Sequence, residues 1–106
     1  MIFVKEGVVF KALRAEIYII LPALEAIFDK VNRQCVITSA ADGTHKHDSF
    51  HYKNLALDLR SRDLPNEQVK LDVLLSLRDA LGENYDVILE SLGNPGEHYH
   101  LEFDPK

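Results

Sequence analysis

Helical and β-type apolar patterns are mixed along this chain without a regular strand–helix–strand alternation, and that order is the strongest constraint on its fold. Apolar residues recur at helical spacing over about residues 14–31 and again over 69–81. Short β-prone runs stand at 35–38, 55–60, 85–90 and 98–103. We therefore expect an α+β fold with a small, mainly antiparallel sheet and flanking helices. The length of 106 residues, without repeats or linker-like segments, predicts one domain over residues 1–106.

Several residues predict where these elements begin and end. Pro22 lies inside the first helical stripe, so we expect a kink or two shorter helices there. Asn66 is placed to cap the second helix and Gly82 to end it. Residues 8–10 form either a short edge strand or an extended lead-in. Residues 39–54 are rich in Gly, Asp, His, Ser and Lys, and we expect a long loop of the kind that often carries function.

Composition argues against several classes of function. Twelve Lys and Arg against seventeen Asp and Glu give a net charge of -5, the wrong sign for a nucleic-acid-binding surface or a polybasic membrane anchor. The single cysteine, Cys35, excludes an intramolecular disulfide, and its apolar neighbours predict a buried thiol. We find neither a signal peptide nor an apolar run of about 20 residues. The expectation is a protein that is cytoplasmic as synthesised, without membrane insertion, and with its oligomeric state left open.

The histidines are confined to two short segments of the chain. They are His45, His47 and His51 in the polar segment, and His98 and His100 near the C-terminus. On a strand, the last two would face the same way because they are two residues apart. Two histidines and Asp58, from three elements, would offer zinc N, N and O ligands and leave a fourth position for water, as in catalytic zinc sites. The alternative is a set of exposed loop histidines beside a structural Asp, and spacing alone leaves both interpretations open.

The residues around these histidines resemble the zinc D-alanyl-D-alanine carboxypeptidase family. Residues 49–58, SFHYKNLALD, are similar to the family signature S-x-H-x-x-G-x-A-x-D, with Asn54 in the position of the Gly. Residues 97–100, EHYH, resemble its closing segment, which combines E-x-x-H with H-x-H. The relatives include D,D-dipeptidases, phage L-alanyl-D-glutamate endolysins and the zinc-containing domain of Hedgehog, which carries a similar Asp-Gly-x-His where this chain has residues 42–45. The resemblance runs from about residue 36 to 103.

The resemblance implies a Hedgehog/D,D-peptidase fold that holds one zinc ion per chain. Its ligands would be His51, Asp58 and His100. Glu97 would act as general base and acid, and His98 would steady the developing oxyanion. A Glu-Ser pair after a similar strand of Hedgehog makes Glu90 a competing base.

Further residues are candidates for contact with the substrate or with the zinc ligands. These are His45 and Ser49 in the polar segment, and Arg60. Many carboxypeptidase relatives carry an Arg soon after the strand equivalent to residues 36–38, where it can hold a substrate carboxylate. This chain has Ser-Ala-Ala-Asp there, so Arg60 and Arg62 are the candidate replacements.

The function implied by the resemblance is hydrolysis of a peptide bond in peptidoglycan stem peptides, of the D,D or L,D type. The small size and the missing export signal suit a phage or prophage enzyme that reaches the cell wall by another route. The alternative is a non-catalytic, zinc-stabilised binding module of the Hedgehog type. A metal-free α+β domain is the third interpretation.

Overall fold

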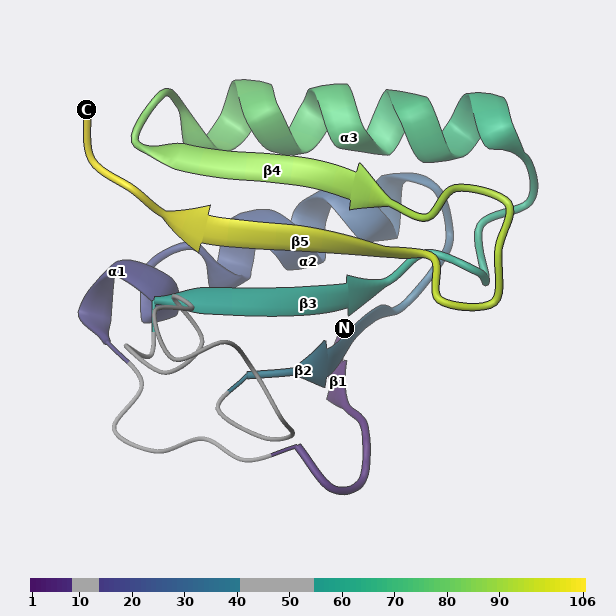
Figure 1. The fold of residues 1–106 in the computed structure, drawn as a ribbon, viewed down its shortest axis with the longest axis horizontal. Helices are drawn as coiled ribbons and strands as arrows, with labels where there is room; N and C mark the ends of the chain where they lie inside the picture. Colours follow the sequence, from purple (N-terminus) through teal and green to yellow (C-terminus); the bar gives the residue numbers. More distant parts are fainter. Residues whose placement is uncertain (9–13, 41–54) are drawn as a thin grey trace.

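The computed structural model describes residues 1–8, 14–40 and 55–106, which form one five-stranded sheet with three helices (Figure 1). The elements are β1 (Ile2–Val4), α1 (Ala15–Tyr18), α2 (Leu21–Lys30), β2 (Cys35–Ser39), β3 (Ala56–Arg60), α3 (Glu67–Leu81), β4 (Tyr85–Glu90) and β5 (His98–Phe103). The order across the sheet is β1-β2-β3-β5-β4. Only β1 and β2 are parallel, and the other three pairs are antiparallel. The predicted α+β class with a mainly antiparallel sheet is therefore confirmed.

The predicted helix boundaries agree with local backbone chemistry. The first helical stripe is divided into α1 and α2, and Pro22 stands in the first turn of α2, where its missing N–H breaks no helical hydrogen bond. Asn66 Oδ1 accepts a hydrogen bond from the Val69 N–H at 2.9 Å, which caps α3. Gly82 follows α3 with a φ of 81°, a value that favours glycine. None of the described helices has the length and apolar character needed to cross a bilayer.

The N-terminal edge strand lies earlier in the chain than the segment 8–10 in which we placed a strand or an extended lead-in. It is β1, which pairs in parallel with β2 through the register Phe3 to Val36. Val8 lies outside any strand, and residues 9–13 are outside the described residues. A strand of three residues has too short a pattern to be distinguished by periodicity, and its pairing with β2 joins residues more than thirty positions apart.

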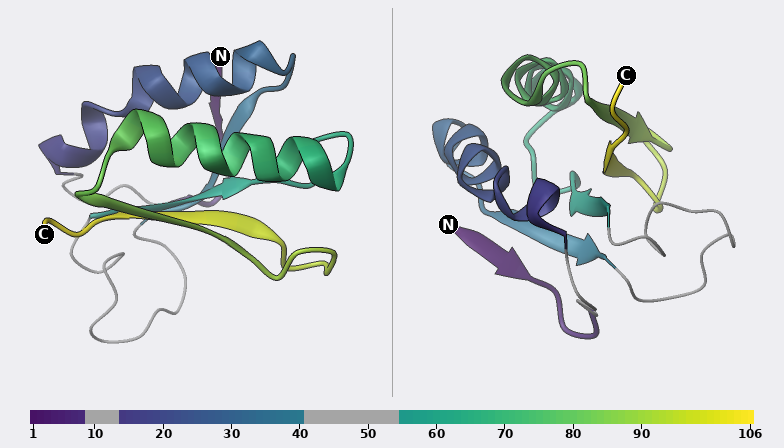
Figure 2. Two further views of the ribbon diagram at one scale, coloured as in Figure 1. Left: turned by 90° about the horizontal axis from the view of Figure 1, so that it is seen from above. Right: turned by 90° about the vertical axis from the view of Figure 1, so that its left-hand side faces the viewer.

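Helices α2 and α3 lie on the same face of the sheet and cover its apolar side (Figure 2). The side chains between the two layers are fully buried or nearly so, among them Leu24, Phe28, Leu59, Leu77 and Leu101. Phe28 also packs edge-to-face against Tyr99, with ring centroids 6.3 Å apart. Cys35 belongs to this core with its side chain fully buried, so the predicted buried thiol is confirmed, and burial raises the pKa of this thiol to about 12.

Strand alternation decides what the opposite face of the sheet carries. Tyr99 and Leu101 of β5 are buried under the helices, so His98, His100 and Glu102 face the other way. In β3, Leu57 and Leu59 are likewise buried. The fold therefore separates an apolar, helix-covered face from a face with ionisable side chains.

Candidate functional site

Cross-strand pairing gathers the candidate site residues on the face of the sheet that is not covered by helices. The register of β3 and β5 pairs Asp58 with His100 and Arg60 with His98. On the other side of β5, Glu90 of β4 also pairs with His98. Because paired residues present their side chains on the same face, these five form one polar group, and Glu102 of β5 joins it because it faces the same way as His100. We call Asp58, Arg60, Glu90, His98, His100 and Glu102 the polar face.

Asp58 and His100 are in direct contact at the centre of the polar face. His100 Nδ1 lies 2.8 Å from Asp58 Oδ1, and both side chains are 17% exposed. The other ring nitrogen, Nε2, lies 2.9 Å from Glu102 Oε1. The hydrogen bond with Asp58 raises the pKa of His100 to about 9, against the opposing effect of burial, and Glu102 adds to the rise. In the absence of a metal, His100 is therefore an imidazolium held between two carboxylates.

The chemistry of this pair fits zinc. Imidazole nitrogen and carboxylate oxygen are both zinc ligands, and two ligands of one tetrahedral zinc lie about 3.3 Å apart, close to the separation of Asp58 and His100. A histidine that binds zinc also commonly donates its second ring N–H to a carboxylate, and Glu102 already occupies that position for His100. The third predicted ligand, His51, lies outside the described residues, as do His45 and Ser49.

His98 adjoins two carboxylates without a close ion pair to either. Its Nδ1–H donates to the Gly96 carbonyl oxygen at 2.7 Å, because a carbonyl can only accept. Its Nε2 lies 3.9 Å from Asp58 Oδ2 and 3.9 Å from Glu90 Oε2. The Glu90 side chain is 44% exposed, so its carboxylate can be reached from solvent. The structure thus brings together Asp58, Glu90, His98 and His100.

Glu97 contacts residues that do not belong to the polar face. Its side chain is only 4% exposed, and its Oε1 lies 2.9 Å from Lys70 Nζ on α3. The hydroxyl of buried Ser61 also donates to Oε1, and the Gly93 N–H donates to Oε2 at 2.9 Å. Burial acts to raise the pKa of Glu97, but these three donors outweigh it and hold the pKa below its usual value. Glu97 precedes β5, as predicted, and it fixes the turn between β4 and β5 to α3.

Two residues in this arrangement were not assigned a role from the sequence. Glu102 shares strand parity with His100, and that spacing of two residues was the signal that could have identified it. Lys70 gave no such signal, because the helical position of a lysine does not reveal that its ammonium meets a carboxylate 27 residues away.

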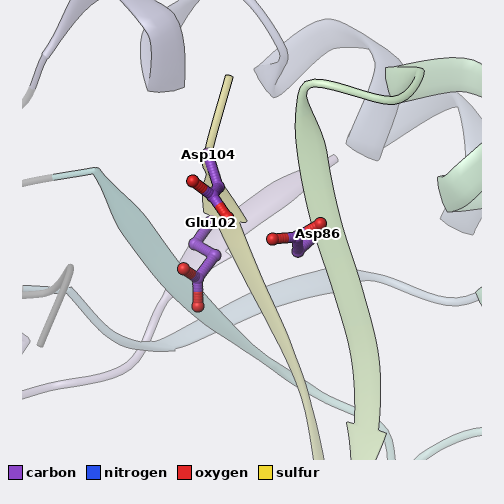
Figure 3. Close-up of side chains that lie close together, drawn as sticks. All are labelled: Asp86, Glu102 and Asp104. Atoms are coloured by element: carbon purple, nitrogen blue, oxygen red, sulfur yellow. The ribbon is translucent and has the colours of Figure 1, made fainter. Parts of the chain in front are cut away.

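A second acidic group lies where β5 ends and shares Glu102 with the polar face. Asp86, Glu102 and Asp104 can each bring one oxygen within 4.8 Å of the others (Figure 3). Lys106 Nζ lies 2.9 Å from Asp86 Oδ1 and 3.3 Å from Asp104 Oδ2. A protein cation therefore already balances part of this charge, and the group is no evidence for zinc.

A cavity of about 300 Å³ adjoins the polar face where β3 ends. Asp58, Arg60 and His98 contribute to its lining, together with Lys5 and Arg62. The predicted site residues in this lining therefore adjoin a concave part of the surface.

Comparison of the chain with models of protein families, with curated proteins and with solved structures gives no match. The function of this protein therefore has to be inferred from its own residues and their geometry. The strongest element of that geometry is the contact between Asp58 and His100, supported by Glu102.

Proposed function

We propose that this protein is a zinc-dependent peptidase that hydrolyses a peptide bond in peptidoglycan stem peptides, with a fold of the Hedgehog/D,D-peptidase type. The observation that carries the proposal is the 2.8 Å contact between Asp58 and His100 on the face opposite the helices. Both residues belong to the motifs that resemble the zinc carboxypeptidase family. Their donor atoms come from neighbouring strands, which supports a site built on rigid elements.

Asp58 and His100 would hold the zinc ion, with His51 as the third ligand expected from the sequence. Glu102 would keep the His100 ring in position through its contact with Nε2 at 2.9 Å. A bound zinc ion supplies a water whose pKa is lowered to about 7 and polarises the carbonyl under attack. One zinc ion per chain is expected.

The general base is proposed to be one of two glutamates. The resemblance implies Glu97, but its carboxylate already accepts from Ser61, Lys70 and Gly93 and would have to release donors before taking up a proton. Glu90 is 44% exposed, and its carboxylate lies 3.9 Å from His98 Nε2 on the polar face. This geometry favours Glu90 as the residue that takes the proton from water and delivers it to the leaving amine.

His98 is proposed to steady the oxyanion that develops on the substrate carbonyl. Its Nδ1–H is committed to the Gly96 carbonyl oxygen, which fixes the ring. Protonation of the ring would give Nε2 a hydrogen to donate towards the space beside Asp58. Donation from Nε2 is therefore the step that we assign to this residue.

The second candidate is a zinc-stabilised binding module without catalysis. The engagement of Glu97 by Lys70 and Ser61 favours it, because a carboxylate held in that way stabilises a turn and does not shuttle protons. A binding module would keep zinc on Asp58 and His100 without any requirement for Glu90.

The test combines metal analysis with digestion of purified peptidoglycan. The unmodified protein is expected to contain about one zinc per chain and to release peptide fragments that mass spectrometry can identify. Glu90→Gln should keep the zinc but lower turnover about 10²- to 10⁴-fold, the range for loss of a general acid–base group. Exposed Glu67 of α3 provides the matched control, and Glu67→Gln should leave both quantities unchanged.

Three outcomes would revise the proposal. If Glu97→Gln is folded and loses turnover while Glu90→Gln keeps it, Glu97 is the base. If the unmodified protein holds zinc but cleaves no peptidoglycan, the binding module replaces the peptidase. If His100→Ala binds zinc as tightly as the unmodified protein, the zinc site is assigned to the wrong residues.

A further inference from the structure

Strand β4 forms one edge of the sheet, because within the described residues it pairs with β5 alone. It is six residues long, whereas the strand at the opposite edge, β1, has three. Helix α3 packs against β4 on one face (Figure 1). Proteins usually shorten or cover an edge of this length, because its unpaired backbone groups can pair with another chain. The outer side of β4 is therefore a surface to which a further strand can be added.

The backbone groups that point outwards from β4 belong to Val87 and Leu89. Phe103 donates its N–H to the Leu55 carbonyl oxygen, so the odd-numbered residues of β5 direct their backbone groups towards β3. The even-numbered residues of β5 therefore bond to their even-numbered partners in β4. Arg78 agrees with this geometry, because its Nε donates to the Val87 carbonyl oxygen at 2.9 Å. The N–H groups of Val87 and Leu89 have no hydrogen-bond partner among the described residues.

A hollow of about 780 Å³ lies along this edge, between β4 and the C-terminal part of α3. Its lining includes Arg78 and Gly82 on the side of the helix, and Val87 and Ile88 on the strand. The volume is within the range of ligand pockets. Ile88 is 45% exposed, and Leu75, one turn before Arg78 on the same side of α3, is 60% exposed. The edge therefore offers apolar contacts to both faces of an added strand.

Negative charge predominates in the hollow. One cation lines it against four carboxylates, and these residues are Arg78, Asp79, Glu83, Asp86 and Glu102. Asp86 and Glu102 already contact cations of the protein. Asp79 and Glu83 are exposed, and neither forms an ion pair with any residue that the structure describes. A second copy of the chain would bring the same acidic groups to this edge, whereas a cationic segment would be attracted to it.

We propose that the outer edge of β4 binds an extended, cationic segment of another protein, which is added to the sheet as a further strand. On the polar face, side chains of this segment would lie beside Asp86, Ile88 and Glu90 in turn. A basic, an apolar and a second basic residue at alternate positions fit that order. On the other face, apolar residues of the segment would lie beside Leu75. This inference does not depend on zinc or on the proposed peptidase function.

Arg78 occupies the edge when no partner is bound. Its Nε uses the Val87 carbonyl oxygen, which is an acceptor that an added strand requires. Its positive charge also repels a cationic segment. The partner should therefore displace this side chain, and removal of the guanidinium should strengthen binding.

Binding of a synthetic peptide to the full chain tests the edge. The probe is acetyl-TKVVVKT-amide, which has lysine and valine in the expected order, and acetyl-TEVVVET-amide is the comparison. We expect the lysine peptide to bind at least tenfold more tightly in an NMR titration at low salt. Ile88→Lys should weaken its binding at least tenfold, and Arg78→Met should strengthen it. Val4→Lys, at an exposed position of the other edge strand, is the matched control and should change nothing.

Hydrogen exchange and N-methylation test the backbone pairing. In the free protein, the N–H groups of Val87 and Leu89 should exchange faster than those of their neighbours in β4, and the peptide should protect them. Two further peptides carry N-methyl groups on either the odd or the even residues, so that each loses the donors along one of its edges. Only one of the two should lose affinity, because a strand at an edge pairs through one side.

Several results would overturn the proposal. These are no binding of the lysine peptide, equal affinity for the two peptides, and unchanged exchange of Val87 and Leu89 in the complex. Equal binding of both N-methylated peptides would show that the backbone is not paired. Weaker binding to Arg78→Met would contradict displacement of that side chain. Protection of Val87 and Leu89 that increases with the concentration of the free protein would assign the edge to a second copy of the chain.

Discussion

His100 is the residue on which the polar face most depends. It contacts Asp58 of β3 through one ring nitrogen and Glu102 of its own strand β5 through the other, so one side chain joins residues of both strands. The same contacts that would orient the ring for zinc stabilise its protonated form when no metal is present. A measured pKa of His100 would therefore show whether its contacts with Asp58 and Glu102 are formed.

The stability of the metal-free protein should depend on pH through His100. Because the pKa of His100 is raised from 6.5 to about 9, its contacts stabilise the fold fully below pH 6.5 and are lost as pH rises through 9. The free energy of unfolding should therefore fall over this interval, by up to about 3 kcal/mol. Histidine NMR titration and urea unfolding of chelator-treated protein measure the two quantities. In Asp58→Asn the pKa should move back towards 6.5, and a pKa below 7 in the unmodified protein would contradict the contact geometry.

At the scale of elements, α3 is the longest helix or strand among the described residues, and its Lys70 is the ion-pair partner of Glu97. Its start is fixed by Asn66, whose side-chain oxygen accepts from the Val69 N–H at 2.9 Å. Lys70 stands one turn after this cap and reaches the turn between β4 and β5. The start of α3 therefore determines where that ammonium lies.

We expect Asn66→Ala to lower the free energy of unfolding by about 1 kcal/mol, because a first-turn N–H loses its acceptor. Asn66→Asp is the matched comparison, since its carboxylate can accept the same hydrogen bond and also interacts favourably with the helix N-terminus. Thermal and urea denaturation compare the three proteins. A loss of the same size in Asn66→Asp would show that the cap contributes nothing.

At the scale of the whole molecule, the pair of Lys70 and Glu97 joins the helical layer to the end of the sheet. The two residues are 27 positions apart, and the Tyr99 hydroxyl strengthens the same junction by donating to the Lys70 carbonyl oxygen. The turn held in this way connects Glu90 with His98, both on the polar face. By holding this turn, the contact between Lys70 and Glu97 helps to position Glu90 before it and His98 after it.

Lys70→Met should destabilise the protein by about 2–4 kcal/mol, because it leaves the nearly buried Glu97 carboxylate without its cation. Adding Glu97→Gln should recover part of the loss, and this coupling is measured by a double-mutant cycle in urea. Lys30→Met at an exposed position of α2 is the control. Since the pKa of Glu97 is lowered, the pair should stabilise the fold above about pH 4.3 and lose that effect as pH falls further. Fully additive effects would mean that the pair makes no net contribution.

Local chemistry of contiguous residues determined most of the elements. Short β-prone runs were sufficient to place β4 and β5, and Pro22, Asn66 and Gly82 were sufficient to divide, begin and end the helices. The alternation of side chains along a strand put His98 and His100 on one face before any strand pairing was known. These features depend on backbone geometry within a few residues, which a sequence expresses directly.

Only the tertiary structure decided what each polar side chain contacts. The pairing of Asp58 with His100 depends on the register of β3 against β5, and the partners of Glu97 come from α3 and from buried Ser61. Likewise, Arg60 and Lys5 line one cavity although they are far apart along the chain. Such contacts arise when the apolar faces of α2, α3 and the sheet are buried against one another. Burial responds to the whole set of apolar residues, so no local pattern around Glu97 or Arg60 encodes its partners.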